Sequence, residues 1–279
     1  MLSLNETDGV FLFDMDGTLT PARKKIQSDM VGFLTLLSKE AHIGVVSGSP
    51  ASYIFEQLEP FISTSTASCL QKVVIMPCNG TQVYVYDTQK CRYNQTYGVT
   101  FKDHLSSLGD SSLLYREIVK NLISLQSHAV EKYSGLPLSG NFVSFRTSLL
   151  NWCMIGRDAN HDQREAFVGL DKKYKIREYL SELLRIRLDA SGLHSIETAL
   201  GGSTSIDIYP DGWDKTHALR HVEPAWTFFF GDKCQPGGND HTLYTHLEKM
   251  GRSWEVKSPK ETILICSQIL EKIKEDRDG

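Results

Sequence analysis

The stretch "VFLFDMDGTLTPARKK", residues 10–25, decides the fold, because an apolar run leads directly into two aspartates that are one residue apart. The run Val10–Phe13 has the composition of a short strand buried on both faces, which is typical of a parallel sheet. Asp14 and Asp16 stand at the carboxyl end of this strand, and Gly17-Thr18 permits a sharp turn. Two carboxylates so close together repel each other and lose water, so we expect a divalent cation to bind them.

The residues that follow repeat this pattern of buried strands and amphipathic helices. Helical patterns at 24–40 and 51–62 alternate with apolar runs at 42–49 and 72–80. The same rhythm returns after residue 212, where "WTFFFGD" has the character of another buried strand. Strands that alternate with helices predict a Rossmann-like α/β core with a parallel sheet, formed by residues 1–89 and 212–279.

The middle of the chain, residues 90–211, has a different character. Two helical stretches are predicted at 103–132 and 162–189, and the segments between and after them alternate in the manner of exposed strands. Helices combined with alternating strands favour an α+β unit with an antiparallel sheet. We therefore predict a second domain that is inserted into the first.

Composition and charge exclude several classes of protein. The chain has 279 residues and a net charge of -4, with no long run of one sign, which argues against general binding to nucleic acid. The six cysteines show no CxxC spacing, which indicates free thiols in a reducing compartment. Residues 1–9 lack the pattern of a signal peptide, and no apolar stretch approaches the ~20 residues of a membrane span. We expect a cytoplasmic protein that does not contact membranes.

Polar residues follow several of the predicted core strands. In an open parallel sheet, ligands bind beyond the carboxyl ends of the strands. The residues found there are Asp14, Asp16, Ser47-Gly48-Ser49, Asn79, and Asp232 with Asn239-Asp240, and Lys215 opens a helix of the same domain. This collection indicates metal-dependent phosphoryl transfer.

Charge then predicts a role for each of these side chains. Asp14 can attack phosphorus and become an aspartyl phosphate, while Asp16 serves as the general acid and base. Magnesium would be held by Asp14, Asp16 and Asp232. Lys215 and Ser49 would neutralise and orient the phosphoryl oxygens.

These motifs have counterparts in a known superfamily. The DxDGT motif at residues 14–18, the later lysine and the GDxxxxxxND segment at 231–240 resemble the haloacid dehalogenase (HAD) superfamily. The segments "FRTSLLNWCMIGR", "SIDIYPDGWDK" and "FFGDKCQPGGNDH" go further and resemble eukaryotic phosphomannomutase. The resemblance implies an HAD-like core with an inserted α+β cap domain that contains an antiparallel sheet.

The resemblance also implies substrate-binding residues. These are Arg23 in the loop after the nucleophile, and Arg146, Arg157, Arg164, Ser205 and Asp207 in the cap. Without the resemblance, Arg146, Ser205 and Asp207 are equally compatible with an ordinary exposed face, and a surface ion pair is the default interpretation of Arg157 and Arg164. The family further implies Mg²⁺ as cofactor, a hexose 1,6-bisphosphate as activator, a hexose phosphate as substrate and a homodimer formed through the cap.

The chain departs from the family pattern at several positions. Ser47 stands where the family often has glycine, and Cys153-Met154 replaces the usual Ser-Pro. The stretch that holds a second cation in the family offers His246 here in place of an aspartate, and the regions 55–75 and 91–140 carry extra residues. We expect the protein to interconvert mannose 6-phosphate and mannose 1-phosphate, supplying GDP-mannose synthesis. The alternatives are a sugar-phosphate phosphatase, in which water accepts the phosphoryl group, and a non-catalytic sugar-phosphate-binding protein.

Overall fold

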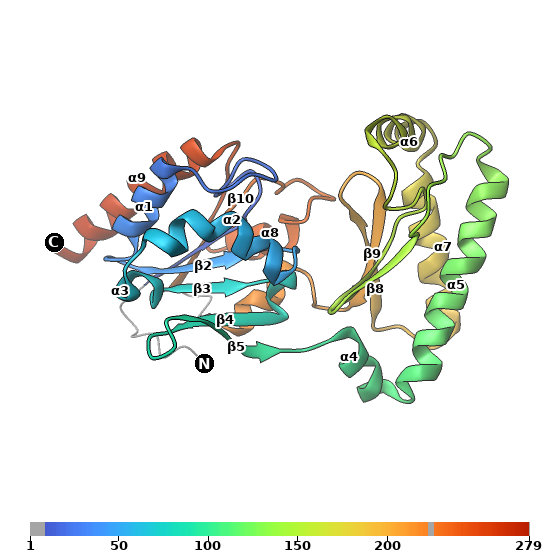
Figure 1. Ribbon diagram of the computed structural model, residues 1–279, viewed down its shortest axis with the longest axis horizontal. Helices are drawn as coiled ribbons and strands as arrows, with labels where there is room; N and C mark the ends of the chain where they lie inside the picture. The colour runs from blue at the N-terminus through green and yellow to red at the C-terminus, as the bar shows by residue number, and fades with distance from the viewer. Residues whose placement is uncertain (1–8, 223–225, 279) are drawn as a thin grey trace. The chain divides into compact units, whose positions relative to one another are not determined.

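The computed structural model describes residues 9–222 and 226–278, and these fold into two compact units. The core unit contains the described residues up to Gly98 and those from Asp214 onward, and the inserted unit is Val99–Trp213. Figure 1 shows this order by colour, because blue and red segments share the core unit while green and yellow segments form the other. The insertion predicted from the sequence is therefore present.

The core unit is built on a seven-stranded sheet in the order β11-β10-β1-β2-β3-β4-β5. Pairing is parallel from β11 to β3 and antiparallel at β4 and β5, which confirms the predicted parallel core. The strands are β1 (Val10–Phe13), β2 (His42–Val46), β3 (Val73–Met76), β4 (Gln82–Asp87), β5 (Arg92–Gly98), β10 (Thr227–Gly231) and β11 (Ser253–Glu255).

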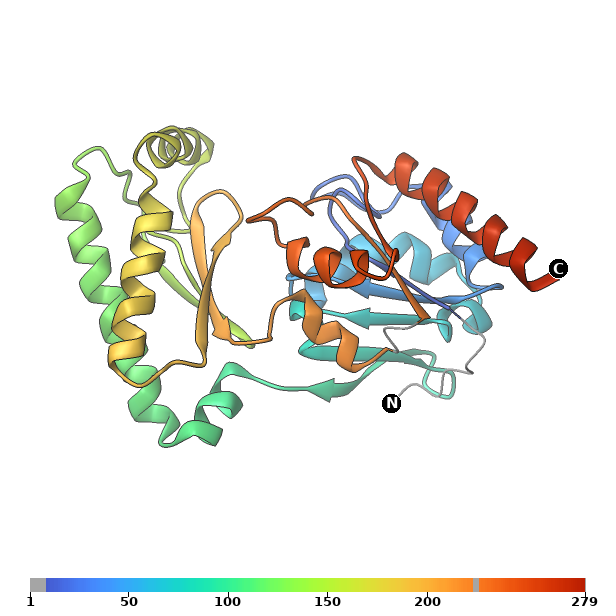
Figure 2. The ribbon, with the colours of Figure 1, turned by 180° about the vertical axis from the view of Figure 1, so that it is seen from behind.

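Both faces of this sheet are covered, as the apolar sequence of β1 predicts. Phe11 and Phe13 pack with α1, α2 and α9 on one face, whereas Val10 and Leu12 pack with η2 and α8 on the other. Figures 1 and 2 show these two groups of helices from opposite sides. The helices are α1 (Ser28–Leu37), α2 (Ala51–Thr64), α3 (Ala67–Leu70), α8 (His241–Glu248) and α9 (Pro259–Asp278), with the short 3₁₀ helices η1 (Cys78–Gly80) and η2 (Lys215–Arg220).

The inserted unit is a four-stranded antiparallel sheet in the order β6-β7-β9-β8, and Figure 2 shows α5 and α7 on one side of it. Leu150 and Ile208 point toward these helices and belong to a single apolar core with them. The elements are β6 (Val143–Arg146), β7 (Leu149–Trp152), β8 (Ile196–Gly201), β9 (Ser205–Pro210), α4 (Phe101–Leu108), α5 (Ser111–Lys132), α6 (His161–Tyr174) and α7 (Ile176–Ala190).

Strand β5 belongs to the core sheet rather than to the inserted domain that the sequence predicted to begin at residue 90. It pairs with β4 along its whole length, and Tyr93 packs against Phe55 and Tyr86 of the core. The inserted unit therefore begins at Val99 and ends at Trp213. Each predicted long helix is also two helices, because Asp110 caps α5 afresh and Lys175 takes a left-handed conformation between α6 and α7.

Two predictions from composition can be compared with the structure. None of the six cysteines forms a disulfide, and only Cys91 is exposed. Within the described ranges, no helix combines the length and the apolar character that crossing a bilayer requires.

Candidate active site

The loop after β1 brings the first carboxylate to the edge of the core sheet. Asp14 is buried, and its backbone N–H donates to the carbonyl of Phe230 on β10 (2.9 Å). Gly17 then turns the chain with φ of 91°, and a Cβ at this position would collide with the carboxylate of Asp232. Only glycine permits this close approach, so the "DGT" segment packs the β1 loop directly against the loop that follows β10.

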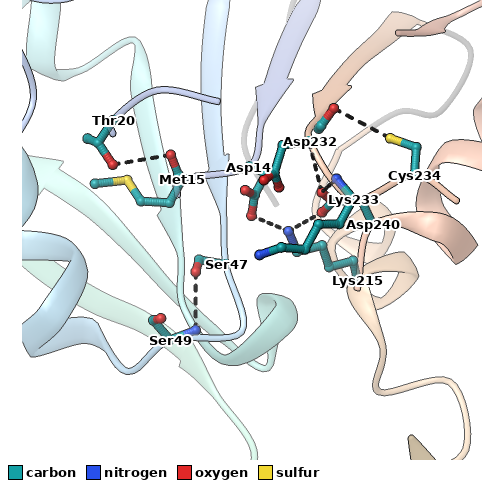
Figure 3. Close-up of polar contacts among 11 residues, drawn as sticks. Asp14, Met15, Thr20, Ser47, Ser49, Lys215, Asp232, Lys233, Cys234 and Asp240 are labelled. Carbon is teal, nitrogen blue, oxygen red and sulfur yellow. Dashed lines mark hydrogen bonds and ion pairs between the residues drawn. The ribbon is translucent and has the colours of Figure 1, made fainter. Parts of the chain in front are cut away.

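Three carboxylates meet around one ammonium group. Atoms of Asp14, Asp232 and Asp240 lie within 4.8 Å of one another. The buried ammonium of Lys215 donates to one oxygen of Asp14 and to one of Asp240, as Figure 3 shows. Three carboxylates against one lysine leave this cluster with an excess of negative charge.

This excess of negative charge contributes to the pKa shifts of the cluster. Burial, reinforced by Asp240 and Asp232, raises the pKa of Asp14 to about 7, although the Lys215 ammonium opposes the shift. Burial also raises the pKa of Asp232. Burial alone would lower the pKa of Lys215, but attraction to Asp14 and Asp240 holds that pKa above its ordinary value. The lysine therefore stays charged, and the carboxylates favour a further cation.

The donor set fits a magnesium ion. The buried Oδ1 of Asp232 has no hydrogen-bond partner among the described residues, and a cluster of carboxylate oxygens suits a hard divalent cation. Asp240 is already engaged, because its Oδ2 accepts from the backbone N–H groups of Asp232 (3.0 Å) and Lys233 (2.9 Å) while its Oδ1 accepts from Lys215. Asp14 and Asp232 are therefore the side chains best placed to hold the metal, with Asp240 anchoring Lys215.

Asp16, the third predicted metal ligand, does not share this cluster. Its Oδ1 accepts hydrogen bonds from the backbone N–H of Arg23 (2.8 Å) and from Nε2 of Gln57 (3.2 Å). The buried Gln57, on α2, also accepts from the hydroxyl of Thr20 (2.8 Å) and, through its carbonyl, from the backbone N–H of Ile26 (3.0 Å). One glutamine thus fastens the 14–26 loop at three points and fixes the orientation of Asp16.

The remaining predicted residues of the core unit lie near the surface or in the neighbouring loop. The side chain of Arg23 is exposed, and its backbone has a positive φ of 59°. Ser49 follows β2, where its N–H donates to the hydroxyl of Ser47 (3.2 Å) and its carbonyl accepts from the N–H of Cys78 (3.0 Å). Figure 3 shows both serines at the same end of the sheet as Asp14.

The stretch around His246, where the family holds a second cation, does not form a cluster of ligands among the described residues. His246 is an exposed residue of α8. Over residues 9–222 and 226–278, Asp14, Asp232 and Asp240 make up the one grouping of three or more acidic, histidine or cysteine side chains with the spacing of a metal site.

In the inserted unit, the sheet face opposite the helices carries a connected polar network. Asn151 on β7 stands directly across from Asp207 on β9, and its Nδ2 donates to the Asp207 carboxylate (2.6 Å). The guanidinium of Arg157, an exposed residue, donates from Nη1 to Oδ1 of Asn151 (2.9 Å). Burial raises the pKa of Asp207, against the effects of the Asn151 hydrogen bond and the positive charges of Arg146 and Arg157.

Arg164 is held by neutral groups. Its guanidinium donates to the carbonyls of Ala159 (2.9 Å) and Arg157 (2.6 Å) and to the hydroxyl of Thr204 (3.1 Å). No carboxylate of the described residues pairs with it, so its positive charge is not cancelled locally. Arg164 therefore both braces the backbone of Arg157 and leaves an uncompensated charge in this part of the unit. Ser205 lies buried at the start of β9, next to Thr204.

Two residues that the structure brings into these networks, Gln57 and Asn151, were absent from the predicted site, and a third, Asp240, was placed there without a role. Asp240 was visible as part of the GDxxxxxxND segment, but spacing alone did not reveal its bond to Lys215. Gln57 lies in the apolar stripe of α2 formed by Ile54, Leu58 and Phe61, where a polar residue is the available signal. Asn151 is likewise a lone polar residue in the buried strand β7.

The chain resembles known proteins over most of its length. Residues 30–272 match the profile of the family described as eukaryotic phosphomannomutase. The chain is 34% identical over 265 residues to a phosphomannomutase of Nicotiana benthamiana, covering 93% of both chains. It is 33% identical over 262 residues to phosphomannomutase 1 of Homo sapiens, covering 92% of this chain and 90% of the human one.

Solved structures share the fold at much lower identity. An IMP-nucleotidase of Plasmodium falciparum superposes with a TM-score of 0.64 at 13% identity, over 98% of this chain and 70% of the nucleotidase. A trehalose-6-phosphate phosphatase of Aspergillus fumigatus gives 0.53 at 15% identity, over 95% and 93%. At such identities the likeness concerns the fold alone. The sequence matches decide the family, and the chain belongs to the eukaryotic phosphomannomutases.

Proposed function

We propose that this protein is a phosphomannomutase, which interconverts mannose 6-phosphate and mannose 1-phosphate through a hexose 1,6-bisphosphate. The observation that carries the proposal is the buried Asp14, bound to Lys215 and adjoining Asp232 and Asp240, in a chain that belongs to the phosphomannomutase family. A nucleophilic carboxylate beside a fixed ammonium and a divalent-cation site suits phosphoryl transfer. When bound by Asp14 and Asp232, Mg²⁺ would offset the charge of the phosphoryl oxygens.

The core unit would perform the bond-making steps. An Asp14 carboxylate oxygen attacks phosphorus of the bisphosphate, the bond from phosphorus to the sugar oxygen breaks, and that oxygen takes a proton from Asp16. In the reverse step, Asp16 removes the proton from a hydroxyl of the hexose monophosphate, and the resulting oxygen attacks the aspartyl phosphate. Both hydrogen bonds found for Asp16 go to Oδ1, which leaves Oδ2 to carry the transferred proton. Lys215 offsets the charge of the Asp14 carboxylate before each attack on phosphorus, and that of the phosphoryl oxygens while Asp14 carries the phosphate.

The inserted unit would bind the phosphate that does not react. A mutase must hold one phosphate, release the bisphosphate, and then hold the other after the sugar has turned. Arg146, Arg157 and Arg164 are the proposed contacts to either phosphate, and Ser205 and Asp207 the proposed contacts to sugar hydroxyls. Charge-assisted hydrogen bonds of about 1.5–3 kcal/mol each would bind the phosphate at either end of the sugar with similar affinity.

A coupled assay tests the proposal. Purified protein would receive mannose 1-phosphate, Mg²⁺ and a trace of glucose 1,6-bisphosphate, and the formation of mannose 6-phosphate would be followed with excess coupling enzymes. We expect isomerisation that depends on the bisphosphate and stops when a chelator removes the metal. If the protein binds mannose 1-phosphate but yields neither isomer nor phosphate, it is a non-catalytic sugar-phosphate-binding protein and the proposal is wrong.

The resemblance to the family supports three further proposals about the setting of this activity. We propose that the protein is a homodimer formed through the inserted unit, that it works in the cytoplasm, and that its mannose 1-phosphate supplies GDP-mannose synthesis. Sedimentation equilibrium of the purified protein tests the first of these. A mass near the 31.4 kDa of one chain would exclude the dimer.

A further inference from the structure

The buried Asn151 connects the guanidinium of Arg157 to the carboxylate of Asp207, and it leaves each of them able to make further hydrogen bonds. Asn151 is 2% exposed, and both ends of its amide are hydrogen-bonded, one to Arg157 (2.9 Å) and one to Asp207 (2.6 Å). A buried amide with both ends satisfied is rigidly held. The mechanism proposed above assigns this asparagine no role.

The direction of the amide is fixed by its partners. A guanidinium can only donate, so Arg157 must face the amide oxygen, and an ionised carboxylate can only accept, so Asp207 must face the amide nitrogen. The positive guanidinium of Arg157 and the negative carboxylate of Asp207 are therefore connected through the neutral amide of Asn151. Arg157 and Asp207 make no direct ion pair in the structure, whereas Arg177 pairs directly with Asp171 in the same unit.

The surroundings of Asp207 favour a direct ion pair with Arg157 if the side chain of Asn151 were removed. The carboxylate lies over Gly201 of β8, where an added Cβ would come within 2.8 Å of it, so this side of the carboxylate is closely packed. Burial disfavours its charge, and the positive charges of Arg146 and Arg157 act against that effect. A partly buried carboxylate next to an exposed guanidinium gains from forming a bidentate pair, which would occupy the donors of Arg157.

We propose that Asn151 is a positioning residue, a neutral spacer that keeps Arg157 and Asp207 apart so that each remains available to the substrate. Arg157 then presents its free donors to a phosphate while Asp207 presents its free oxygen to a sugar hydroxyl. The ligand class is a monosaccharide phosphate with a hydroxyl near the phosphate that is bound. This inference rests on the proposed function for the identity of the ligand, but not on catalysis.

A double-mutant cycle tests the spacer. The dissociation constant for mannose 1-phosphate would be measured by calorimetry without added divalent metal, on the wild type, Asn151→Ala, Asp207→Asn and the double variant. Because Asn151→Ala lets Asp207 capture Arg157, we expect the dissociation constant to rise by about tenfold to a hundredfold. In the Asp207→Asn background no carboxylate is present to capture Arg157, so the same change should alter the constant less than about twofold.

The cycle separates a spacer from a residue that only fills space. Equal effects of Asn151→Ala in the two backgrounds would overturn the proposal, because a packing defect does not depend on the charge at residue 207. Asn151→Ser repeats the measurement with a polar side chain too short to make both bonds, and the same dependence on Asp207 is expected. Ser144→Ala is the matched control. Ser144 lies opposite Asn151 on β6, and Asn141 is the one hydrogen-bond partner of its hydroxyl in the described part of the chain, so its loss should leave binding unchanged.

The readout also keeps this proposal distinct from the proposed function. A wild type that binds mannose 1-phosphate but does not isomerise it would refute the mutase and leave the cycle decisive. A wild type that isomerises mannose 1-phosphate and shows no coupling between residues 151 and 207 would refute the spacer and leave the mutase standing.

Discussion

Among the contacts that the structure describes, Lys215 supplies the only ammonium bound to the cluster of Asp14, Asp232 and Asp240, and replacing it by methionine removes that charge. Methionine is close to lysine in size and apolar, so the change deletes charge while filling most of the space. Lys215 is 1% exposed, and its two partners, Asp14 and Asp240, are 3% and 0% exposed. Water can therefore do little to compensate the carboxylates after the ammonium is lost.

The size of the effect follows from the two contacts. Each charge-assisted hydrogen bond contributes about 1.5–3 kcal/mol, and removing one partner of a buried ion pair destabilises a protein by about 3–5 kcal/mol. We expect Lys215→Met to lower the free energy of unfolding of the metal-free protein by about 3–5 kcal/mol. Added Mg²⁺ should recover part of this loss, because a cation held by Asp14 and Asp232 supplies charge to the same carboxylates.

Urea denaturation with a chelator and with Mg²⁺ measures both quantities. Lys233→Met is the matched control, since Lys233 lies beside Asp232 but is exposed, and we expect it to change the free energy by less than about 1 kcal/mol. If Lys215→Met unfolds at the same urea concentration as the wild type, the ammonium does not hold this cluster. If Mg²⁺ stabilises neither protein, the carboxylates are not a metal site.

Three further outcomes are expected. Asp14→Asn should lower isomerisation at least about a thousandfold and abolish the acid-stable labelling of the protein by a ³²P-hexose bisphosphate, since the amide is no nucleophile; retained labelling would contradict this role. Gln57→Leu, which frees Asp16 from α2, should lower kcat for mannose phosphate by about ten- to a hundredfold with little change in KM. The loss of kcat for p-nitrophenyl phosphate should be smaller, because its leaving group needs no general acid. Equal losses of kcat on both substrates would contradict a positioning role for Gln57. Because the pKa of Asp14 is raised to about 7 in the folded protein, the stability that this group contributes is present below its ordinary pKa and is lost as pH rises through about 7. Mg²⁺ competes with the proton on Asp14, so the rise in Tm caused by Mg²⁺ should grow between about pH 5 and pH 8. A rise in Tm that is independent of pH would contradict this competition.

The core of the fold could be predicted because its pattern is local. The run Val10–Phe13 is apolar at every position, and the structure buries it on both faces of a parallel sheet. Asp14 and Asp232 follow strands β1 and β10, which are neighbours in the sheet, so the rule that ligands bind at the carboxyl ends of strands placed them together.

The remainder depended on contacts between distant residues. Sequence spacing does not show that both oxygens of Asp240 accept hydrogen bonds, from Lys215 and from the loop after β10. Nor does it show that Asp16 accepts a hydrogen bond from Gln57 and lies outside the cluster of metal ligands. Strand β5 was assigned to the wrong domain because its alternating sequence suits any antiparallel edge, and only its pairing with β4 decides the matter. The role of Asn151 required the β7–β9 register, which no local pattern shows.

The central claim is that the phosphoryl group returns to the sugar rather than passing to water. Phosphorus NMR on one sample of the protein with Mg²⁺, mannose 1-phosphate and a trace of glucose 1,6-bisphosphate follows mannose 6-phosphate and free phosphate together. We expect mannose 6-phosphate to accumulate well ahead of free phosphate, and only when the bisphosphate is present. Free phosphate that forms as fast as the isomer, or faster, would show that the protein is a sugar-phosphate phosphatase and would contradict the account.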